Sequence, residues 1–144
     1  MESGGNEKMD KRQSILIIDD TPMIIRSLNG ILKDDYDISV AKSGEQGIET
    51  AKKNMPDIIL LDLMMPGMSG FDVIEALKSD DLTKGIRIVL ITGSDSTDDE
   101  ERGYALGAVD YIRKPFVDNI VRHRVKVNAE FVEMSRIIKN FTVG

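Results

Sequence analysis

The most constraining feature of this sequence is an alternation of short apolar runs with longer segments of mixed polarity. Five runs rich in β-branched residues occur at residues 14–19, 36–41, 57–62, 86–92 and 108–113. Three of them (SILIID, DIILLD and IRIVLIT) are apolar nearly throughout, which is typical of parallel strands buried on both faces. The segments between them carry apolar residues at helical spacing. A repeated β-α alternation requires right-handed crossovers, so it predicts an α/β fold: a five-stranded parallel sheet with five helices on its two faces.

Several of the helical segments begin with residues that favour a helix start. Thr21 stands before Pro22, an order typical of the N-cap and first position of a helix. Ser43 and Gln46 have the spacing of a capping box. Ser96 precedes an acidic run, DDEE, which suits the positive end of a helix dipole. These signals place helix starts directly after the apolar runs.

The last helix is predicted to be much longer than the others. It runs from Asp118 to about Phe141, which gives about 24 residues and about 36 Å at 1.5 Å per residue. Its distal part therefore extends beyond the domain. A coiled-coil-like stripe, interrupted by Arg124, consists of Ile120, Val127, Phe131, Met134, Ile138 and Phe141. We expect the stripe either to pair with a second copy, or to belong to a helix that folds back on its own domain or to a linker.

The chain divides into one domain with two flanking segments. Residues 1–13 are polar and are expected to form a disordered lead-in. Residues 14–127 hold the β-α alternation, and residues 128–144 form the distal extension of the last helix, a linker or dimerisation segment. A chain of 144 residues with 41% hydrophobic composition can bury a single core of ordinary size.

The composition excludes several classes of chemistry. Because the chain has no cysteine and a single histidine, His123, it lacks disulfides, cysteine nucleophiles and zinc sites of the usual kinds. Any metal must be held by oxygen, which favours magnesium or calcium. The net charge of -6 disfavours direct nucleic-acid binding. The apolar runs are too short to span a membrane and the N-terminus lacks a signal-peptide core, so we expect a cytoplasmic protein without a membrane partner.

Polar residues follow the apolar runs at the predicted strand ends. The first run ends at Asp19 and Asp20, the third at Asp62 and the fourth at Thr92, and Lys114 follows the fifth. Sites in open parallel sheets form outside the carboxyl ends of the strands, so these side chains are expected to share one pocket. Carboxylates about 4 Å apart repel by roughly 4 kcal/mol per pair at an effective dielectric of about 20. The pocket therefore needs a cation, and magnesium fits the oxygen ligands.

This pocket suits phosphate chemistry. Magnesium held by few carboxylates keeps open positions that phosphate oxygens occupy. Lys114 adds a positive charge for the same anion, and Thr92 adds a hydroxyl donor. Asp62 is then placed to attack phosphorus and form an aspartyl phosphate. Taken singly, each residue also has a structural explanation, such as a helix cap, a turn or a solvated lysine, and their coincidence is what favours the functional one.

Together, these residues resemble a known family. The stretches IIDD (17–20), LLDLMMPGMSG (60–70), VLITG (89–93) and GAVDYIRKPF (107–116) are similar to the receiver domain of two-component response regulators. The resemblance covers roughly residues 13–127. It implies a flavodoxin-like fold with strand order 2-1-3-4-5.

The resemblance also implies a phosphoacceptor and a metal site. Asp62 would receive a phosphoryl group from a sensor histidine kinase or a phosphotransfer protein. Asp20 and Asp62 would bind Mg²⁺ directly, Asp19 would bind it through water, and the backbone carbonyl of Met64 would complete the set, with Mn²⁺ as a substitute. Because the Met64 side chain cannot orient an attacking water, we expect slow loss of the phosphoryl group.

Further residues would transmit the signal, again by resemblance. Lys114 would pair with the phosphate, and a cis Lys114–Pro115 bond would aim it inward. Thr92 would be the switch hydroxyl and Tyr111 the aromatic rotamer switch. The surface of the fourth helix, the fifth strand and the last helix would then change and signal to a downstream effector or output domain.

Two alternatives stay open at this point. One is a receiver that acts as an interaction module without phosphorylation. The other is a magnesium-dependent aspartyl-phosphate phosphatase, but the haloacid-dehalogenase type needs an acid two residues after its nucleophile, where this chain has Met64. The absence of a GK[ST] loop disfavours a nucleotide-binding protein. We therefore expect a signalling phosphoacceptor that catalyses only its own phosphorylation and dephosphorylation.

Overall fold

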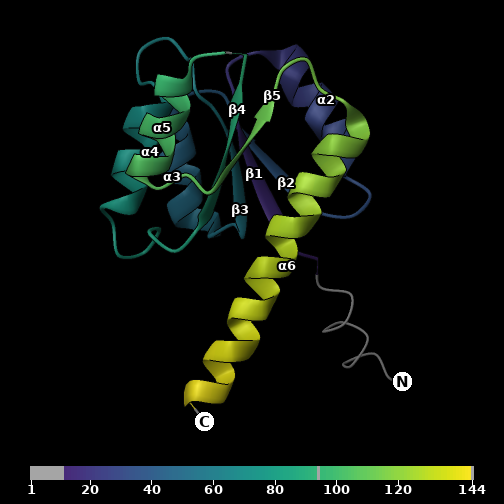
Figure 1. The fold of residues 1–144 in the computed structure, drawn as a ribbon, viewed down its shortest axis with the longest axis vertical. Helices are drawn as coiled ribbons and strands as arrows, with labels where there is room; N and C mark the ends of the chain where they lie inside the picture. Colours follow the sequence, from purple (N-terminus) through teal and green to yellow (C-terminus); the bar gives the residue numbers. More distant parts are fainter. Residues whose placement is uncertain (1–11, 94, 144) are drawn as a thin grey trace.

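The computed structural model describes residues 12–93 and 95–143, and within them five parallel strands form one sheet. The strands are β1 (Ser14–Ile18), β2 (Asp37–Ala41), β3 (Ile58–Asp62), β4 (Arg87–Thr92) and β5 (Asp110–Arg113). The helices are α2 (Pro22–Leu32), α3 (Gly44–Asn54), α4 (Gly70–Lys78), α5 (Thr97–Leu106) and α6 (Asp118–Val143). The strand order is β2-β1-β3-β4-β5, with α2 and α6 on one face and α3, α4 and α5 on the other (Figure 1). The predicted fold class is confirmed.

The two cores alternate along the central strands. In β3, Ile59 and Leu61 pack toward α3 and α4, whereas Ile58 and Leu60 pack toward α2 and α6. All residues of β3 are buried, because the strand lies in the middle of the sheet with a helical layer on each side. The continuous apolar runs therefore result, as expected, from burial of the strands on both faces of the sheet. Strand β1 begins with its run, whereas the other four strands begin one or two residues later than theirs. Tyr36, for example, still donates its N–H to the carbonyl of Leu32 at the end of α2.

The helix starts differ from the prediction at two positions. Thr21 occupies the N-cap of α2, but its side chain makes no capping hydrogen bond. Its backbone N–H instead donates to Asp19 Oδ1 at 2.9 Å, so the start of α2 fixes an acidic side chain of the strand end. Ser43 Oγ accepts from the N–H of Gln46 at 3.1 Å, as expected. The Gln46 side chain, however, accepts from the N–H of Lys42, one residue before the capping-box position.

The last helix is 26 residues long, which corresponds to about 39 Å. Val121, Val125 and Ala129 are buried against α2 and the sheet, and beyond them α6 projects away from the domain (Figure 1). The residues of the predicted stripe are between 47% and 81% exposed. The ring of Phe131 in this stripe nevertheless lies 3.8 Å from the guanidinium of Arg87, and Arg136 of α6 pairs with Asp57, so the distal helix keeps some contacts with its own domain. No helix of the described residues is long and apolar enough to cross a membrane.

The predicted lead-in, residues 1–13, lies outside the described residues except for its last two. Arg12 donates from Nη1 to the carbonyl of Lys33 at 2.8 Å, and Gln13 donates from its amide to the carbonyl of Ala129 at 3.0 Å. These two residues are therefore bonded to the C-cap of α2 and to α6.

Candidate functional site

Asp19, Asp20 and Asp62 meet at the carboxyl edge of the sheet. One carboxylate oxygen of each lies within 4.8 Å of the others. Asp19 follows the last residue of β1, and Asp62 ends β3. Because β1 and β3 pair directly, with Ile18 opposite Leu61, the two strand ends bring these side chains together. The predicted acidic cluster is thus a consequence of the sheet topology.

Asp19 is almost completely enclosed, with 1% of its surface exposed. Its Oδ1 accepts from the N–H of Thr21, while Oδ2 is buried and accepts no hydrogen bond from any residue that the structure describes. The ammonium of Lys114 lies 3.9 Å from that oxygen. Burial is the main cause that raises the pKa of Asp19. A buried carboxylate oxygen without a hydrogen bond, beside two other carboxylates, fits a site for a divalent cation.

Asp62 is 4% exposed and lies between a cation and another acid. Its Oδ1 accepts from the N–H of Met64 at 3.3 Å and from Lys114 Nζ at 3.4 Å. Burial, followed by the charge of Asp19, raises the pKa of Asp62 to about 6, although Lys114 opposes the shift. Without a bound cation, the Asp62 carboxylate is therefore partly protonated near pH 6.

Lys114 and Thr92 complete the inner part of the pocket. Thr92 is the buried last residue of β4, and its carbonyl accepts from the N–H of Lys114 at 2.8 Å. The peptide bond between Lys114 and Pro115 is cis. The backbone pairing of β4 and β5 thus places the hydroxyl-bearing and the ammonium-bearing residue next to each other, and the ammonium reaches Asp62.

Tyr111 connects this edge of the sheet with α5. Its half-buried ring meets Tyr104 edge to face, with centroids 6.2 Å apart and an interplanar angle of 71°. Arg113, on the same strand, pairs with Asp95 at 3.0 Å and with Glu100 at 2.8 Å. The sequence indicated a role for Tyr111 by resemblance, but it gave no signal for Arg113, whose partners lie in α5 and in the loop before it.

The contact of α5 with the sheet depends on a glycine. Gly103 is buried in α5, and a Cβ at this position would lie 2.5 Å from Leu90 Cδ1 of β4. The glycine is therefore explained by close packing. The neighbouring residue Arg102 places its guanidinium 4.0 Å from the centroid of the Phe71 ring in α4. Polar and ring contacts thus supply much of the attachment of this helix.

A cavity of about 530 Å³ opens over the acidic cluster. It is lined by Asp20, Thr21, Asp62, Met64, Gly93, Asp99 and Lys114. The Met64 side chain is 67% exposed at this edge. Asp99, in the first turn of α5, was not predicted from the sequence to belong to the site.

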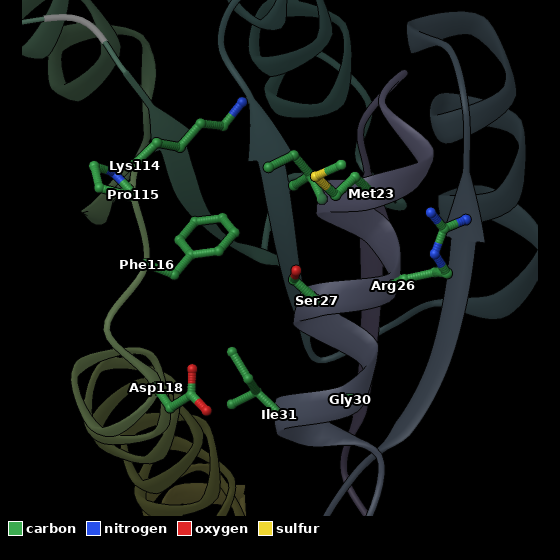
Figure 2. Close-up of a pocket in the computed structure, with 10 residues that line it drawn as sticks. Met23, Arg26, Ser27, Gly30, Ile31, Lys114, Pro115, Phe116 and Asp118 are labelled. Atoms are coloured by element: carbon green, nitrogen blue, oxygen red, sulfur yellow. The ribbon is translucent and has the colours of Figure 1, made fainter.

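A second groove, of about 490 Å³, adjoins the first through Lys114. It lies between α2 and the segment that follows β5. Figure 2 shows Phe116 reaching toward α2, with Met23 and Ser27 on the opposite wall. The groove therefore extends the first cavity along α2 and the start of α6.

Fold and pocket together define a doubly wound α/β protein whose strand ends bring three carboxylates and a lysine to one pocket. The sequence matches the family model of the response regulator receiver domain over residues 15–126. The chain therefore belongs to the response regulator receiver family, the family suggested by its motifs.

Individual relatives agree with this assignment. The chain is 41% identical over 118 residues to the response regulator PleD of Caulobacter vibrioides, covering 81% of this chain and 26% of the relative. It is 38% identical over 116 residues to the DNA-binding response regulator MtrA of Mycolicibacterium smegmatis, covering 80% and 50%. The chain thus spans only about a quarter to a half of the length of these relatives.

Solved structures show the same fold. The chemotaxis protein CheY4 of Vibrio cholerae aligns with a TM-score of 0.77 and 26% identity, covering 81% of this chain and 98% of the other. A CheY-like receiver domain protein of Methanospirillum hungatei aligns with a TM-score of 0.81 and 25% identity, covering 87% and 99%.

Proposed function

We propose that this chain is a phosphoacceptor switch that receives a phosphoryl group on Asp62 from a sensor histidine kinase or a phosphotransfer protein. The observation that carries the proposal is the setting of the Asp62 carboxylate. It is 4% exposed, lies 3.4 Å from the Lys114 ammonium and lines a cavity open to solvent. The Asp62 nucleophile, the Lys114 ammonium that would bind the transferred group and the cavity that gives access therefore lie together.

The acidic cluster is proposed to hold Mg²⁺, with Mn²⁺ as a substitute. Asp20 and Asp62 would supply direct carboxylate ligands, Asp19 would act through water, and the carbonyl of Met64 would add a neutral oxygen. When bound, the ion would offset the repulsion among the carboxylates and withdraw charge from the phosphoryl oxygens. The buried Asp19 Oδ2, which lacks a hydrogen bond from the described residues, supports a cation at this place.

The transfer itself would use the side chains at the strand ends. An oxygen of ionised Asp62 attacks phosphorus, and the phosphorus–nitrogen bond of the donor breaks with its electron pair moving to the leaving imidazole. Lys114 donates a hydrogen bond to an oxygen of the transferred group, and the Thr92 hydroxyl is placed to donate to another. Attack of water on the same phosphorus would later break the bond between phosphorus and the Asp62 oxygen, which restores the Asp62 carboxylate and releases inorganic phosphate. No catalysis beyond these two reactions is proposed.

Phosphorylation is proposed to change the surface formed by α5, β5 and α6. α5 packs on the sheet through Gly103, with Tyr104 on Tyr111 and Glu100 on Arg113, so it has few buried apolar contacts. An element of low local stability suits a two-state response to a new charge nearby. A change in this surface would signal to a downstream effector or an output domain. The cytoplasmic location expected from the sequence stays a prediction.

Intact mass measurement tests the proposed acceptor. The natural chain, Asp62→Asn and Asp57→Asn are incubated with a small-molecule phosphodonor, with and without Mg²⁺. Asp57→Asn is the matched control, because it removes an aspartate at the opposite end of the same strand. We expect a gain of one phosphoryl mass that requires both Mg²⁺ and Asp62. A gain in Asp62→Asn would refute the acceptor, and no gain in a folded natural chain would favour the unphosphorylated interaction module.

A second copy of the chain is the partner proposed for α6. The exposed stripe lies across the helix from the buried residues Val121 and Ala129, and of its members Phe131 contacts the guanidinium of Arg87. Arg124 interrupts the stripe and pairs with Asp110 at 3.0 Å. The uninterrupted part, from Val127 to Phe141, is about two heptads long, which is marginal for an isolated pair of helices. We therefore expect weak, concentration-dependent dimerisation.

Sedimentation velocity tests this homodimer. Ile138→Asp places a charge within the stripe and should leave only monomer. Leu82→Asp, a change of an exposed apolar residue outside α6, should dimerise as the natural chain does. A natural chain that stays monomeric at high concentration, both phosphorylated and unphosphorylated, would contradict the proposed pairing.

A further inference from the structure

A groove of about 510 Å³ lies between the distal half of α6 and the amino ends of β3 and β4. Its lining comes from the segment before β3, the segment that leads into β4, and α6 between Phe131 and Lys139. The acidic cluster lies at the carboxyl ends of the same strands. This groove, hereafter the distal groove, therefore belongs to the opposite edge of the sheet, and the proposed phosphotransfer gives it no role.

The lining of the distal groove offers apolar surface to solvent. Met55, Leu82 and Phe131 line it and are 46%, 64% and 55% exposed. Ile86, which is 6% exposed, belongs to the same lining. A concave volume of this size with an apolar lining is typical of sites that hold one small molecule.

Arg87 is held in this lining by two contacts. Its Nε donates to Asn128 Oδ1 at 2.9 Å, and its guanidinium carbon lies 3.8 Å from the centroid of the Phe131 ring. Asn128 is 2% exposed, and its own amide donates to the carbonyl of Arg124 at 2.8 Å, which fixes the acceptor in place. A guanidinium that is bonded at Nε and stacked on a ring loses little further freedom when it binds an anion.

The hydrogen-bonding capacity of Arg87 is only partly used. Its two Nη groups donate no hydrogen bond to any residue that the structure describes. Arg136, in the same lining, differs because it pairs with Asp57. Asp110, whose charge acts on Arg87, pairs with Arg124 at 3.0 Å. Arg87 therefore offers a positive charge and a planar set of donors, which is the arrangement that binds a carboxylate through two parallel hydrogen bonds.

We propose that the distal groove binds a small organic acid, with the carboxylate on Arg87 and the apolar body against Phe131 and Leu82. The occupant would contact the start of β4 and the distal half of α6 at once, so it would hold this part of the helix in a fixed position against the domain. The inference does not rest on phosphorylation of Asp62, because every contact it uses lies at the other edge of the sheet.

Titration of the natural chain with 2-naphthoate and with 2-naphthamide tests this site. The two compounds share one ring system and differ in the carboxylate, so the difference between their affinities reports the anion interaction. Binding is followed in ¹H–¹⁵N spectra, including the Nε–H signal of Arg87, at a low protein concentration that keeps the chain monomeric. We expect a dissociation constant of about 0.1 to 1 mM for the naphthoate and about 5- to 20-fold weaker binding of the naphthamide. The difference should shrink at about 1 M salt.

Arg87→Met and Arg102→Met form a matched pair of variants. Each removes a guanidinium that lies over a ring, 3.8 Å from the Phe131 centroid and 4.0 Å from the Phe71 centroid, but Arg102 is not among the residues that line the groove. We expect Arg87→Met to bind the naphthoate only as tightly as the naphthamide, and Arg102→Met to bind both as the natural chain does. Arg87→Lys keeps the charge without the planar donors and should retain part of the preference.

The outcomes decide between a carboxylate site and a surface without one. Equal affinities of the natural chain for the two compounds would overturn the proposal, as would an unchanged preference in a folded Arg87→Met. Absence of binding at several times the expected dissociation constant, or shifts that leave the signals of Arg87 and Phe131 in place, would overturn it as well. Because no phosphodonor is present, none of these outcomes bears on phosphorylation of Asp62, which the mass measurement tests separately.

Discussion

Replacement of Asp62 by asparagine should make the cation-free protein more stable at neutral pH. In the folded chain, burial and the neighbouring Asp19 raise the pKa of Asp62 from 3.8 to about 6. A carboxyl group with a raised pKa favours folding only while it is protonated. Its contribution is fully present below pH 3.8 and is lost as the pH rises through about 6. Asparagine is neutral throughout, so it avoids this loss.

The size of the effect follows from the shift. A change of roughly two pKa units corresponds to about 3 kcal/mol, at 1.36 kcal/mol per unit. The cavity admits water to the site, so we reduce this to about 2 kcal/mol for solvent screening. The gain should appear in full above about pH 7 and disappear near pH 4, where the natural Asp62 is protonated as well. For a domain of this size, about 2 kcal/mol corresponds to roughly 6 to 10 °C in Tm.

Urea and thermal unfolding in the presence of a chelator test this prediction at pH 7.5 and at pH 4. Asp57→Asn provides a control of opposite sign, because Asp57 accepts from the N–H of Ser14 at 2.8 Å and pairs with Arg136, and its loss should destabilise the domain. Added Mg²⁺ should stabilise the natural chain and have little effect on Asp62→Asn. The reasoning fails if Asp62→Asn is no more stable than the natural chain at pH 7.5, or if the gain is as large at pH 4.

Two further predictions concern packing and are measured by urea unfolding. Gly103→Ala should destabilise the domain by about 1 to 2 kcal/mol, because the added Cβ would lie 2.5 Å from Leu90 Cδ1. The control, Gly30→Ala, should stabilise α2 by up to about 1 kcal/mol, because nothing lies within 4 Å of the added Cβ. Equal effects of the two substitutions would contradict the close approach of α5 to Leu90. Asn128→Ala should cost about 2 to 3 kcal/mol, because Asn128 is buried and accepts a hydrogen bond from Arg87 at 2.9 Å; an unchanged midpoint would show that this bond is dispensable.

The sheet and the acidic cluster were predictable because their signals are local and the topology is restrictive. Continuous apolar runs identified β1, β3 and β4, and a parallel sheet brings every carboxyl end to the same edge. The adjacency of Asp19 and Asp62 then required only that β1 and β3 pair. Asp99 escaped prediction because the acidic run at the start of α5 has a sufficient local explanation in the helix dipole. Sequence spacing alone does not show which acid of a first turn faces a neighbouring strand end.

Helix caps were predicted less well than strands. Thr21 occupies the N-cap of α2, but its side chain accepts no capping hydrogen bond, and its own backbone N–H donates to Asp19. At α4, a complete capping box joins Ser69 and Asp72, with reciprocal bonds of 3.3 and 3.2 Å, although the pair is not of the Ser-Glu or Ser-Gln type that the pattern favours. Shorter acids thus substitute where the local backbone allows.

Helix α6 has two apolar faces, and the sequence alone does not show which of them is buried. One face carries Val121, Val125 and Ala129, and the other carries the exposed stripe with its larger side chains, including Phe131 and Ile138. Hydrophobicity alone favours burial of the second face, yet the first is buried. Strands of five residues span about 17 Å, whereas α6 spans about 39 Å, so the distal half of the helix has no sheet beneath it. The length of the helix relative to the strands, rather than its apolar content, therefore determines which residues are left for a partner.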